Sequence, residues 1–205
     1  MTTQPNEHSG ILVQGHIKIF DPETKEVFID KRNAIHYENM SISLAESLAN
    51  QGQGFIYQMV FGTGGTLVDP TGIITYLTPN TTGTNSSLYN ETYAKVVDDR
   101  SNNNVDPTRN KIETRHVSGT NYTDIVVTCL LDYGESIANQ SAFDTATNPS
   151  DTTVFDELGL RAYSSTGTGR LLTHVIFHPV QKALNRLIQI DYTVRVQSLT
   201  GFSEA

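Results

Sequence analysis

The sequence lacks several features that would point to a particular class of protein. Among its 205 residues there is no tryptophan and a single cysteine, Cys129. One cysteine cannot form an internal disulfide, so the fold does not depend on an oxidising compartment. Cys129 lies in an apolar run at residues 125–131, without a nearby base to activate it. This setting predicts a buried, unreactive thiol rather than a nucleophile.

Basic residues and long apolar runs are also scarce. The chain has 14 Lys and Arg against 22 Asp and Glu, a formal net charge of −8, and no Lys/Arg cluster. Nucleic-acid phosphates are bound by such clusters, so we expect no nucleic-acid partner. No apolar run approaches the ~18 residues of a membrane span, and the first residues do not resemble a signal peptide. We therefore expect no membrane partner, and synthesis and assembly in a cytoplasm.

The clearest positive signal is a period of two near the end of the chain. From residue 188 to residue 197, apolar and polar side chains alternate almost without a break. Such alternation predicts a β-strand with one buried and one wet face. The apolar set is Ile188, Ile190, Tyr192, Val194 and Val196, and the polar set is Gln189, Asp191, Thr193, Arg195 and Gln197.

Strand patterns recur along the whole chain and predict an all-β protein, an antiparallel β-sandwich of about eight to ten strands. One short helix is expected, capped by Asn39 or Ser41, with Met40, Leu44 and Leu48 on its apolar side. The run at 55–61 is apolar on both faces and is predicted to be a central strand. The expected strands cover residues 11–20, 26–29, 55–61, 93–97, 112–117, 122–133, 154–163, 170–178 and 187–197, with turns at 21–24 and 118–121.

Long polar stretches separate these strands. We expect a flexible N-terminal tail at residues 1–10 and a single sandwich domain at 11–205, with long inserted loops at 67–110 and 134–151. The second of these loops includes a short helical turn around 137–143. Loops of this length are either disordered or functional, and our hypothesis is that they become ordered on assembly with a partner. The residues expected to contact partners are Thr78, Asn80, Tyr89, Asp99, Asn103 and Asp106.

The sequence gives little evidence for a catalytic, phosphate-binding or metal-binding site. The glycine-rich run at 62–66 is not followed by the Lys-Ser/Thr of a phosphate-binding loop, so it is interpreted as a turn. His174 and His178 fall on one face of a strand, about 13 Å apart, too far to bind one metal ion. We expect them to be polar residues on a half-exposed face or an interface. The carboxylate pair Asp156/Glu157 is too generic to assign to catalysis.

Residues 98–106 resemble a calcium-binding loop in composition. Asp99, Ser101 and Asn103 have alternating oxygen ligands, but the central Gly and the closing Glu of an EF-hand are missing. A solvated loop is the expectation here, with a weak structural cation as the alternative. No catalytic motif occurs, so we expect no enzyme activity, no metal site and no cofactor.

The order of several motifs resembles a known group of proteins. A helix rich in Leu and Ala precedes a strand ending in Phe61-Gly62-Thr63-Gly64. Later come Glu157-Leu158-Gly159-Leu160, Leu171-Leu172-Thr173-His174-Val175-Ile176-Phe177, Pro179-Val180-Gln181-Lys182 and a closing strand. This order is similar to that of tailed-bacteriophage virion proteins described as tail-fibre, tail-collar or minor structural proteins. The long polar inserts resemble structural proteins of T4-like phages of marine bacteria.

The resemblance covers roughly residues 33–66 and 154–197 and departs from the family in two places. Arg161 stands where the family often has Phe, and the segment 67–110 is longer than usual. The resemblance implies a sandwich of jelly-roll type and assigns Gly62, Gly64 and Gly159 to backbone geometry.

The function implied by the resemblance is structural. The chain would be a virion component in the tail, baseplate or neck, or a fibre-mounting protein, forming a homo-oligomer and contacting other virion proteins. A capsid decoration (cement) protein is the alternative. A carbohydrate-binding module is a further alternative, with Tyr57, Tyr76, Tyr89 and Tyr93 as stacking rings.

Overall fold

The computed structural model describes residues 8–135 and 152–202. The helical turn expected around 137–143 and most of the expected loop 134–151 lie outside the described residues, as do residues 1–7 of the expected tail. Residues 8–10 belong to the first strand rather than to a tail. No helix in the described part of the chain is long and apolar enough to cross a membrane.

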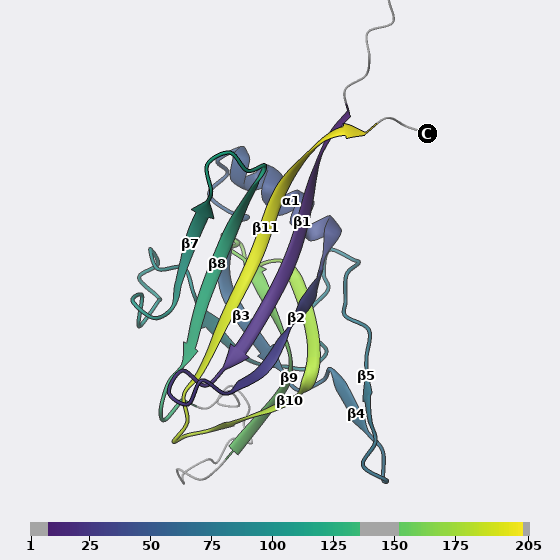
Figure 1. Cartoon of the computed structure of the whole chain (residues 1–205), viewed down its shortest axis with the longest axis vertical. Helices are drawn as coiled ribbons and strands as arrows, with labels where there is room; N and C mark the ends of the chain where they lie inside the picture. The colour runs from purple at the N-terminus through teal and green to yellow at the C-terminus, as the bar shows by residue number, and fades with distance from the viewer. Residues whose placement is uncertain (1–7, 136–151, 203–205) are drawn as a thin grey trace, which may run out of the picture.

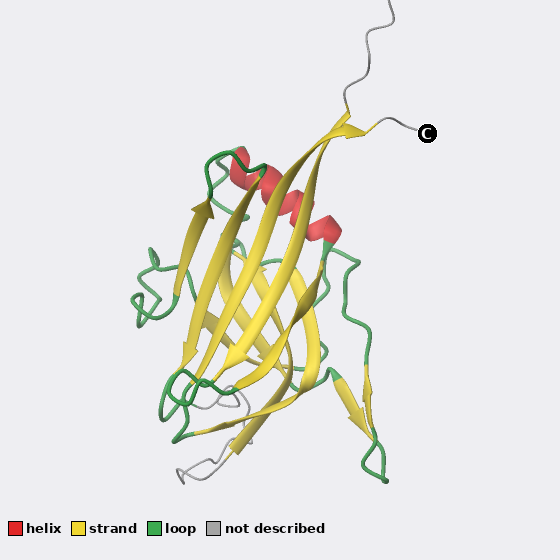
Figure 2. Cartoon of the chain, viewed as in Figure 1, coloured by secondary structure: helices red, strands yellow, loops and turns green. Residues whose placement is uncertain are grey.

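Eleven strands and one helix make up the described part of the chain (Figures 1 and 2). The helix α1 spans Tyr37–Leu48. The strands are β1 (His8–Phe20), β2 (Val27–Ile35), β3 (Ile56–Gly62), β4 (Thr66–Val68), β5 (Ile74–Tyr76), β6 (Glu91–Val96), β7 (Lys111–His116), β8 (Tyr122–Leu131), β9 (Thr152–Ala162), β10 (Thr173–Ala183) and β11 (Ile188–Phe202).

Nine of these strands form one antiparallel sheet in the order β6-β3-β9-β10-β2-β1-β11-β8-β7. The sheet curls so that its two halves face each other across the core (Figure 2). The halves are joined by a short ladder in which Thr173 and His174 of β10 pair with Ile35 and Ala34 of β2. The predicted mostly antiparallel β fold is therefore confirmed, and β3 is internal as expected, between β6 and β9.

The alternating C-terminal strand lines this core. Ile188, Ile190, Tyr192 and Val194 are buried, and only the last of the predicted apolar set, Val196, is partly exposed. On the other half of the sheet, the rings of Phe61, Phe155 and Phe177 meet edge to face with centroids 5.5 and 5.6 Å apart. Cys129 is buried as predicted, and burial raises the pKa of its thiol to about 12.

Helix α1 closes one end of the curled sheet (Figure 1). Its N-cap is His36, not Asn39 or Ser41, because the His36 ring supplies the acceptor, Nδ1, for the Asn39 backbone N–H at 3.2 Å. The Asn39 side chain instead donates to the Leu171 carbonyl at 3.0 Å and ties the helix to the sheet. Met40 is buried, but Leu48 is 84% exposed, so the predicted apolar side of the helix is only partly covered.

The segment 67–110 was expected to be a long insert of loops with one strand at 93–97; that strand is present as β6 (Glu91–Val96), and β4 and β5 are two further strands that were not expected. β4 and β5 form a separate two-stranded hairpin that projects from the body (Figure 1), and β6 joins the edge of the main sheet. The stretches without strand structure are therefore 77–90 and 97–110. β2 also runs to Ile35, six residues beyond the predicted end of that strand.

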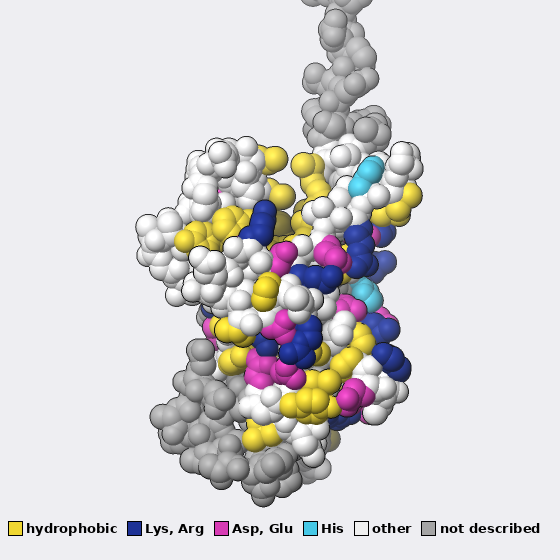
Figure 3. Space-filling view, turned by 90° about the vertical axis from the view of Figure 1, so that its left-hand side faces the viewer, with side chains coloured by type: hydrophobic (Ala, Val, Ile, Leu, Met, Phe, Trp, Pro, Cys, Tyr) yellow, Lys and Arg dark blue, Asp and Glu magenta, His cyan; other side chains and the backbone are white. Residues whose placement is uncertain are grey.

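An apolar pocket lies between helix α1 and the sheet. Its volume is about 240 Å³, and it is lined by residues of α1, β7, β8 and β11 and by the segment that leads into β3. Figure 3 shows hydrophobic side chains in a hollow at the upper end of the molecule.

Candidate functional site

A fully buried carboxylate–imidazole pair lies on two neighbouring strands. Glu157 on β9 and His174 on β10 are both 0% exposed, and Oε2 of Glu157 lies 2.9 Å from Nε2 of His174. The other ring nitrogen, Nδ1, accepts the backbone N–H of Asn80 at 2.8 Å. Because Nδ1 is an acceptor, the ring proton sits on Nε2 and is donated to Glu157.

Glu157 also accepts three backbone N–H groups. Its Oε1 binds the amides of Gly64 and Asn90 at 3.0 and 2.8 Å, and its Oε2 binds the amide of Tyr89 at 2.9 Å. Burial acts to raise the pKa of Glu157, but the hydrogen bonds from His174 and the three amides outweigh it and lower the pKa. The carboxylate is therefore ionised at neutral pH, with four donors around it. Such a saturated group holds structure in place and has no lone pair directed at a substrate.

The neighbouring carboxylate, Asp156, anchors the next residues of the same loop. It accepts the backbone amides of Gly65 and Thr66, both at 2.9 Å, and the hydroxyl of Thr66. Together, Asp156 and Glu157 bind amides at both ends of the segment 63–90. We call these two carboxylates, His174 and the amides that they bind the carboxylate latch.

The glycines singled out in the sequence surround this latch. A Cβ at Gly62 would lie 2.5 Å from Oε1 of Glu157, and one at Gly64 would lie 2.6 Å from Cβ of Tyr89. A Cβ at Gly159 would lie 2.3 Å from the carbonyl oxygen of Thr173. None of the three has a positive φ, so close approach rather than a left-handed backbone excludes a side chain there.

Three of the predicted contact residues lie beside the latch. The Asn80 amide binds His174, and the Tyr89 hydroxyl donates to the carbonyl of Thr78 at 2.7 Å. The Tyr89 ring lies 5.7 Å from the His174 ring, centroid to centroid, and is half exposed. The structure thus brings Thr78, Asn80 and Tyr89 together on one anchored loop.

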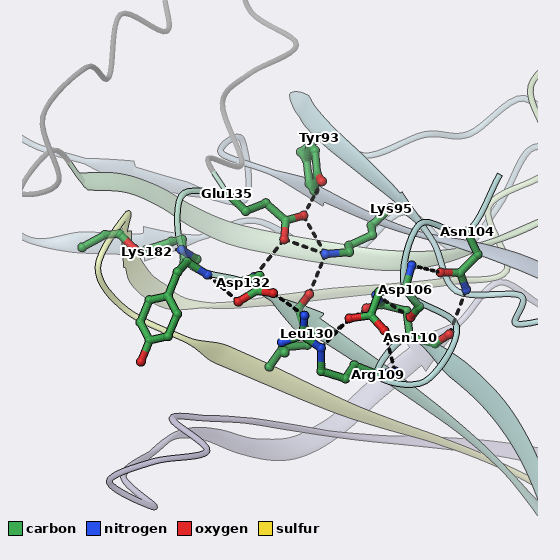
Figure 4. Close-up of polar contacts among 12 residues, drawn as sticks. Tyr93, Lys95, Asn104, Asp106, Arg109, Asn110, Leu130, Asp132, Glu135 and Lys182 are labelled. Carbon is green, nitrogen blue, oxygen red and sulfur yellow. Dashed lines mark hydrogen bonds and ion pairs between the residues drawn. The ribbon is translucent and has the colours of Figure 1, made fainter.

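A second polar group connects the edge strand β6 with the end of β8, which lies next to the other edge strand, β7 (Figure 4). Nζ of Lys95, on β6, donates to the Leu130 carbonyl of β8 at 2.6 Å and to both carboxylate oxygens of Glu135. Oδ1 of Asn110, at the start of β7, accepts the Leu130 backbone N–H at 2.9 Å. Side chains therefore take the place of a backbone ladder here. We call Lys95, Asn110, Glu135 and the Leu130 backbone the seam cluster.

The other three predicted contact residues lie in the loop next to this seam, and they do not converge on one point. Asn103 donates to the Tyr57 hydroxyl at 3.0 Å, Asp106 pairs with Thr108 and Arg109, and Asp99 is exposed. Within residues 8–135 and 152–202, no group of three or more His, Cys, Asp or Glu side chains is placed to hold a metal ion.

A buried lysine near the seam was not anticipated from the sequence. Lys182 on β10 is 1% exposed, and its Nζ donates to the Ala183 carbonyl at 2.8 Å. Burial lowers the pKa of Lys182 to about 8, an effect that the charges of Glu135 and Asp132 partly oppose. The signal for its burial was the alternation in Val180-Gln181-Lys182, which are buried, exposed and buried in the structure.

The expectation for the two histidines of β10 was wrong for His174. We expected both on a half-exposed face, but His174 is fully buried whereas His178 is exposed and lies 3.3 Å from the Tyr76 hydroxyl. The pairing of β10 with β9 shifts register between Ile176 and Val180, and this irregularity places His178 outside the buried face.

The tyrosines considered for sugar stacking are spread over separate elements. Tyr57 packs edge to face on Tyr163, and Tyr93 packs on Phe61 and donates its hydroxyl to Glu135. Tyr76 is on β5, and Tyr89 is in the latched loop. The four rings therefore do not form one platform.

Arg161 has a specific partner. Its guanidinium group makes a bidentate ion pair with the carboxylate of Glu91 on β6, and its side chain is largely buried. Glu91 thus compensates the charge of a largely buried arginine.

Comparison with protein families, with curated proteins and with solved structures finds no match to this chain.

Proposed function

We propose that this chain is a non-enzymatic structural component of a bacteriophage virion, in the tail, baseplate or neck or as a mount for fibres. It would act through contacts with copies of itself and with other virion proteins. The proposal starts from the family resemblance, and the geometry of the carboxylate latch supports it.

The observation that carries the proposal is the convergence of the resembling motifs. Three motifs meet at the latch, although the first lies more than 90 residues before the other two. They are Phe61-Gly62-Thr63-Gly64, Glu157-Leu158-Gly159 and Thr173-His174. The Glu157 carboxylate and the His174 ring are bound internally, so these motifs hold segment 63–90 against the body. A segment held in this way presents contact residues in a fixed geometry, as an assembly protein requires.

Exposed apolar side chains support a contact role. Leu67, Val68 and Ile73 of the projecting hairpin are exposed, as are Val105 and Val117 elsewhere. Apolar groups gathered on a projection are typical of surfaces that a partner covers.

We also propose the finer description of the sheet as a sandwich of jelly-roll type. The β2–β10 ladder supports this description because it is short: only two residue pairs join the two larger halves of the sheet. An experimental structure without this ladder would leave two stacked sheets and favour the proposal. A retained ladder would favour a single curled sheet.

Fractionation of purified virions tests the function. Heads and tails are separated, and the chain is quantified in each fraction by mass spectrometry. We expect a few to a few tens of copies travelling with the tails. Hundreds of copies with the heads would instead favour a capsid decoration protein, and absence from both fractions would overturn the virion role.

A further inference from the structure

Two apolar features lie at opposite ends of the molecule. The first is the hairpin of residues 66–76, made of β4, β5 and the turn between them, which we call the arm. Leu67 is 59% exposed, and Val68 and Ile73 are each 63% exposed. The arm projects from the body at the end away from helix α1 (Figure 1).

The arm is held in a defined shape and direction. At its tip, Oδ1 of Asp69 accepts the backbone amides of Thr71 and Ile73 at 2.8 and 2.9 Å. At its base, Asp156 binds the Thr66 amide, and the Gly65 carbonyl accepts the Leu77 amide at 2.9 Å. An arm that is already ordered loses little entropy on binding, which favours association.

Apolar side chains lie on both faces of the arm. In its register Val68 is opposite Ile74, so these two share a face, and Leu67 lies on the other face. The arm therefore presents an aliphatic side chain on either of its faces.

The second feature is the pocket beneath helix α1, which we call the helix pocket. Its volume is about 240 Å³, and a cavity of about 150 Å³ already admits a benzene ring. Aliphatic side chains such as those of the arm therefore fit. Its apolar lining includes Met40, Leu44, Phe55, Ile112, Ile125 and Val194.

The charges on the two features are complementary. Asp69, at the tip of the arm, is the only charged residue between positions 62 and 90. Arg100 is the one charged side chain among the described residues that line the helix pocket; it is 80% exposed, and its Nε lies 3.4 Å from Oδ1 of Asp98. An acidic tip beside the pocket would thus meet a basic residue at the pocket's edge and compete with Asp98 for it.

We propose that an apolar side chain at the tip of the arm of one copy inserts into the helix pocket of a second copy. The two features face away from each other within one copy, so the contact joins different regions of two copies, head to tail. Such a contact closes into a ring or continues as a filament, depending on the rotation between copies. The inference deepens the proposed function and rests on it for the expectation that copies meet in an assembly.

Cross-linking between two single-cysteine variants tests this contact. Val68→Cys places a thiol on the arm, and Ser47→Cys places one at the helix pocket. The two purified proteins, one carrying a size tag, are mixed at high concentration with a short thiol-to-thiol cross-linker. The native Cys129 is buried and does not compete. We expect a mixed dimer, and its loss when Val27→Cys, at an exposed valine outside the arm, replaces Val68→Cys.

Charge variants of the pocket partner refine the test. Arg100→Glu reverses the charge at the pocket edge and is expected to reduce the mixed dimer, whereas Arg100→Lys is expected to preserve it. Circular dichroism of each variant establishes that it is folded.

Two results would overturn the inference: no mixed dimer at high concentration, or dimers formed by the Val68→Cys protein alone in preference to mixed ones. The failure of the inference and that of the function are distinguishable. A mixed dimer from a chain that is absent from virions would leave the contact and remove the function. A chain that is found in virions but gives no mixed dimer would support the proposed function and refute the contact between arm and pocket.

Discussion

The segments 63–90 and 97–110 are both long polar connections, but they are held to the body in different ways. Segment 63–90 is bound through its backbone amides to Asp156 and Glu157, buried carboxylates of a distant strand. Segment 97–110 is held chiefly by its own side chains, with Asn104 donating to the carbonyls of Asp98 and Asn110. Segment 97–110 is the more highly charged of the two, yet its charges are not what the buried carboxylates bind.

The difference shows that the order of a loop depends on the partners that the body offers it. A buried carboxylate with several amide donors is costly to leave unpaired, so the segment that supplies the donors is held firmly. Amide side chains and exposed ion pairs hold a loop more weakly, because water competes for the same groups. The predictions below test this contrast.

Removing the charge of the latch is expected to have the largest effect. Glu157→Gln keeps the shape of the side chain but leaves His174 and three backbone amides with a poorer acceptor. We expect a loss of about 3 kcal/mol or more in the free energy of unfolding, measured by urea denaturation. The control is Glu113→Gln on β7, whose partners Lys111 and Arg115 are exposed. The free energy of unfolding of this control is expected to change little. Equal losses in the two variants would contradict the contrast between buried and exposed carboxylates.

The same carboxylate predicts an acid dependence. The pKa of Glu157 in the folded state lies below its ordinary value of 4.5. Its stabilising contribution is therefore fully present above pH 4.5 and is lost as the pH falls through the folded-state pKa. The stability difference between wild type and Glu157→Gln should shrink over that acidic range. A difference that stays constant there would refute the ionised latch.

Removing the seam's amide acceptor is expected to cost less. Asn110→Ala leaves the Leu130 backbone N–H without its acceptor in a buried position. We expect a loss of about 1–3 kcal/mol in the free energy of unfolding. Asn103→Ala, in the same loop but exposed, is the matched control and is expected to change it little. A larger loss for Asn103→Ala than for Asn110→Ala would contradict the assigned role of the seam.

Lys182 predicts a rise in stability at alkaline pH. Its folded-state pKa of about 8 lies below the ordinary 10.5, so the unfolded chain binds more protons between these values. Stability therefore rises from pH 8 towards pH 10.5, by about 2–3 kcal/mol. Lys182→Met should remove this rise, whereas Lys18→Met on β1 should keep it. The test is urea denaturation across this range, and an unchanged rise in Lys182→Met would refute the assignment.

The smallest effect is expected in local exchange rates. In the free protein, the backbone amides of Gly64, Tyr89 and Asn90 should exchange with solvent more slowly than those of Arg100 and Asn103, because the first three bind a buried carboxylate. Hydrogen exchange followed by NMR measures this. Fast exchange of the latch amides in the free protein, and slow exchange in the assembled particle, would support the hypothesis that assembly orders the loop.

Much of the fold was predictable because its signals are local. The alternation from Ile188 to Val196 indicated which face of the strand is buried, and the doubly apolar run at 55–61 indicated an internal strand. In the structure, the first lines the core and the second lies between β6 and β9. A side chain's face follows from the strand period alone, so no knowledge of distant residues was needed.

The latch was not predictable, because its parts are distant in the sequence. Asp156/Glu157 looked like a generic acidic pair, and His174 looked half exposed. Only the pairing of β9 with β3 and β10 brings Glu157 to His174 and to the glycines that follow β3. The irregularity in β10 after Ile176 was equally invisible, since a register shift leaves no mark in the alternation before it.

The sequence by itself thus determined the antiparallel β character of the protein, its internal strand and the buried face of its last strand, because backbone periodicity and turn chemistry act over a few residues. The tertiary structure alone decided which carboxylates are buried, which loop they hold and where an apolar arm leaves the body. Those outcomes depend on which distant donors reach a buried charge, and desolvation makes that pairing obligatory.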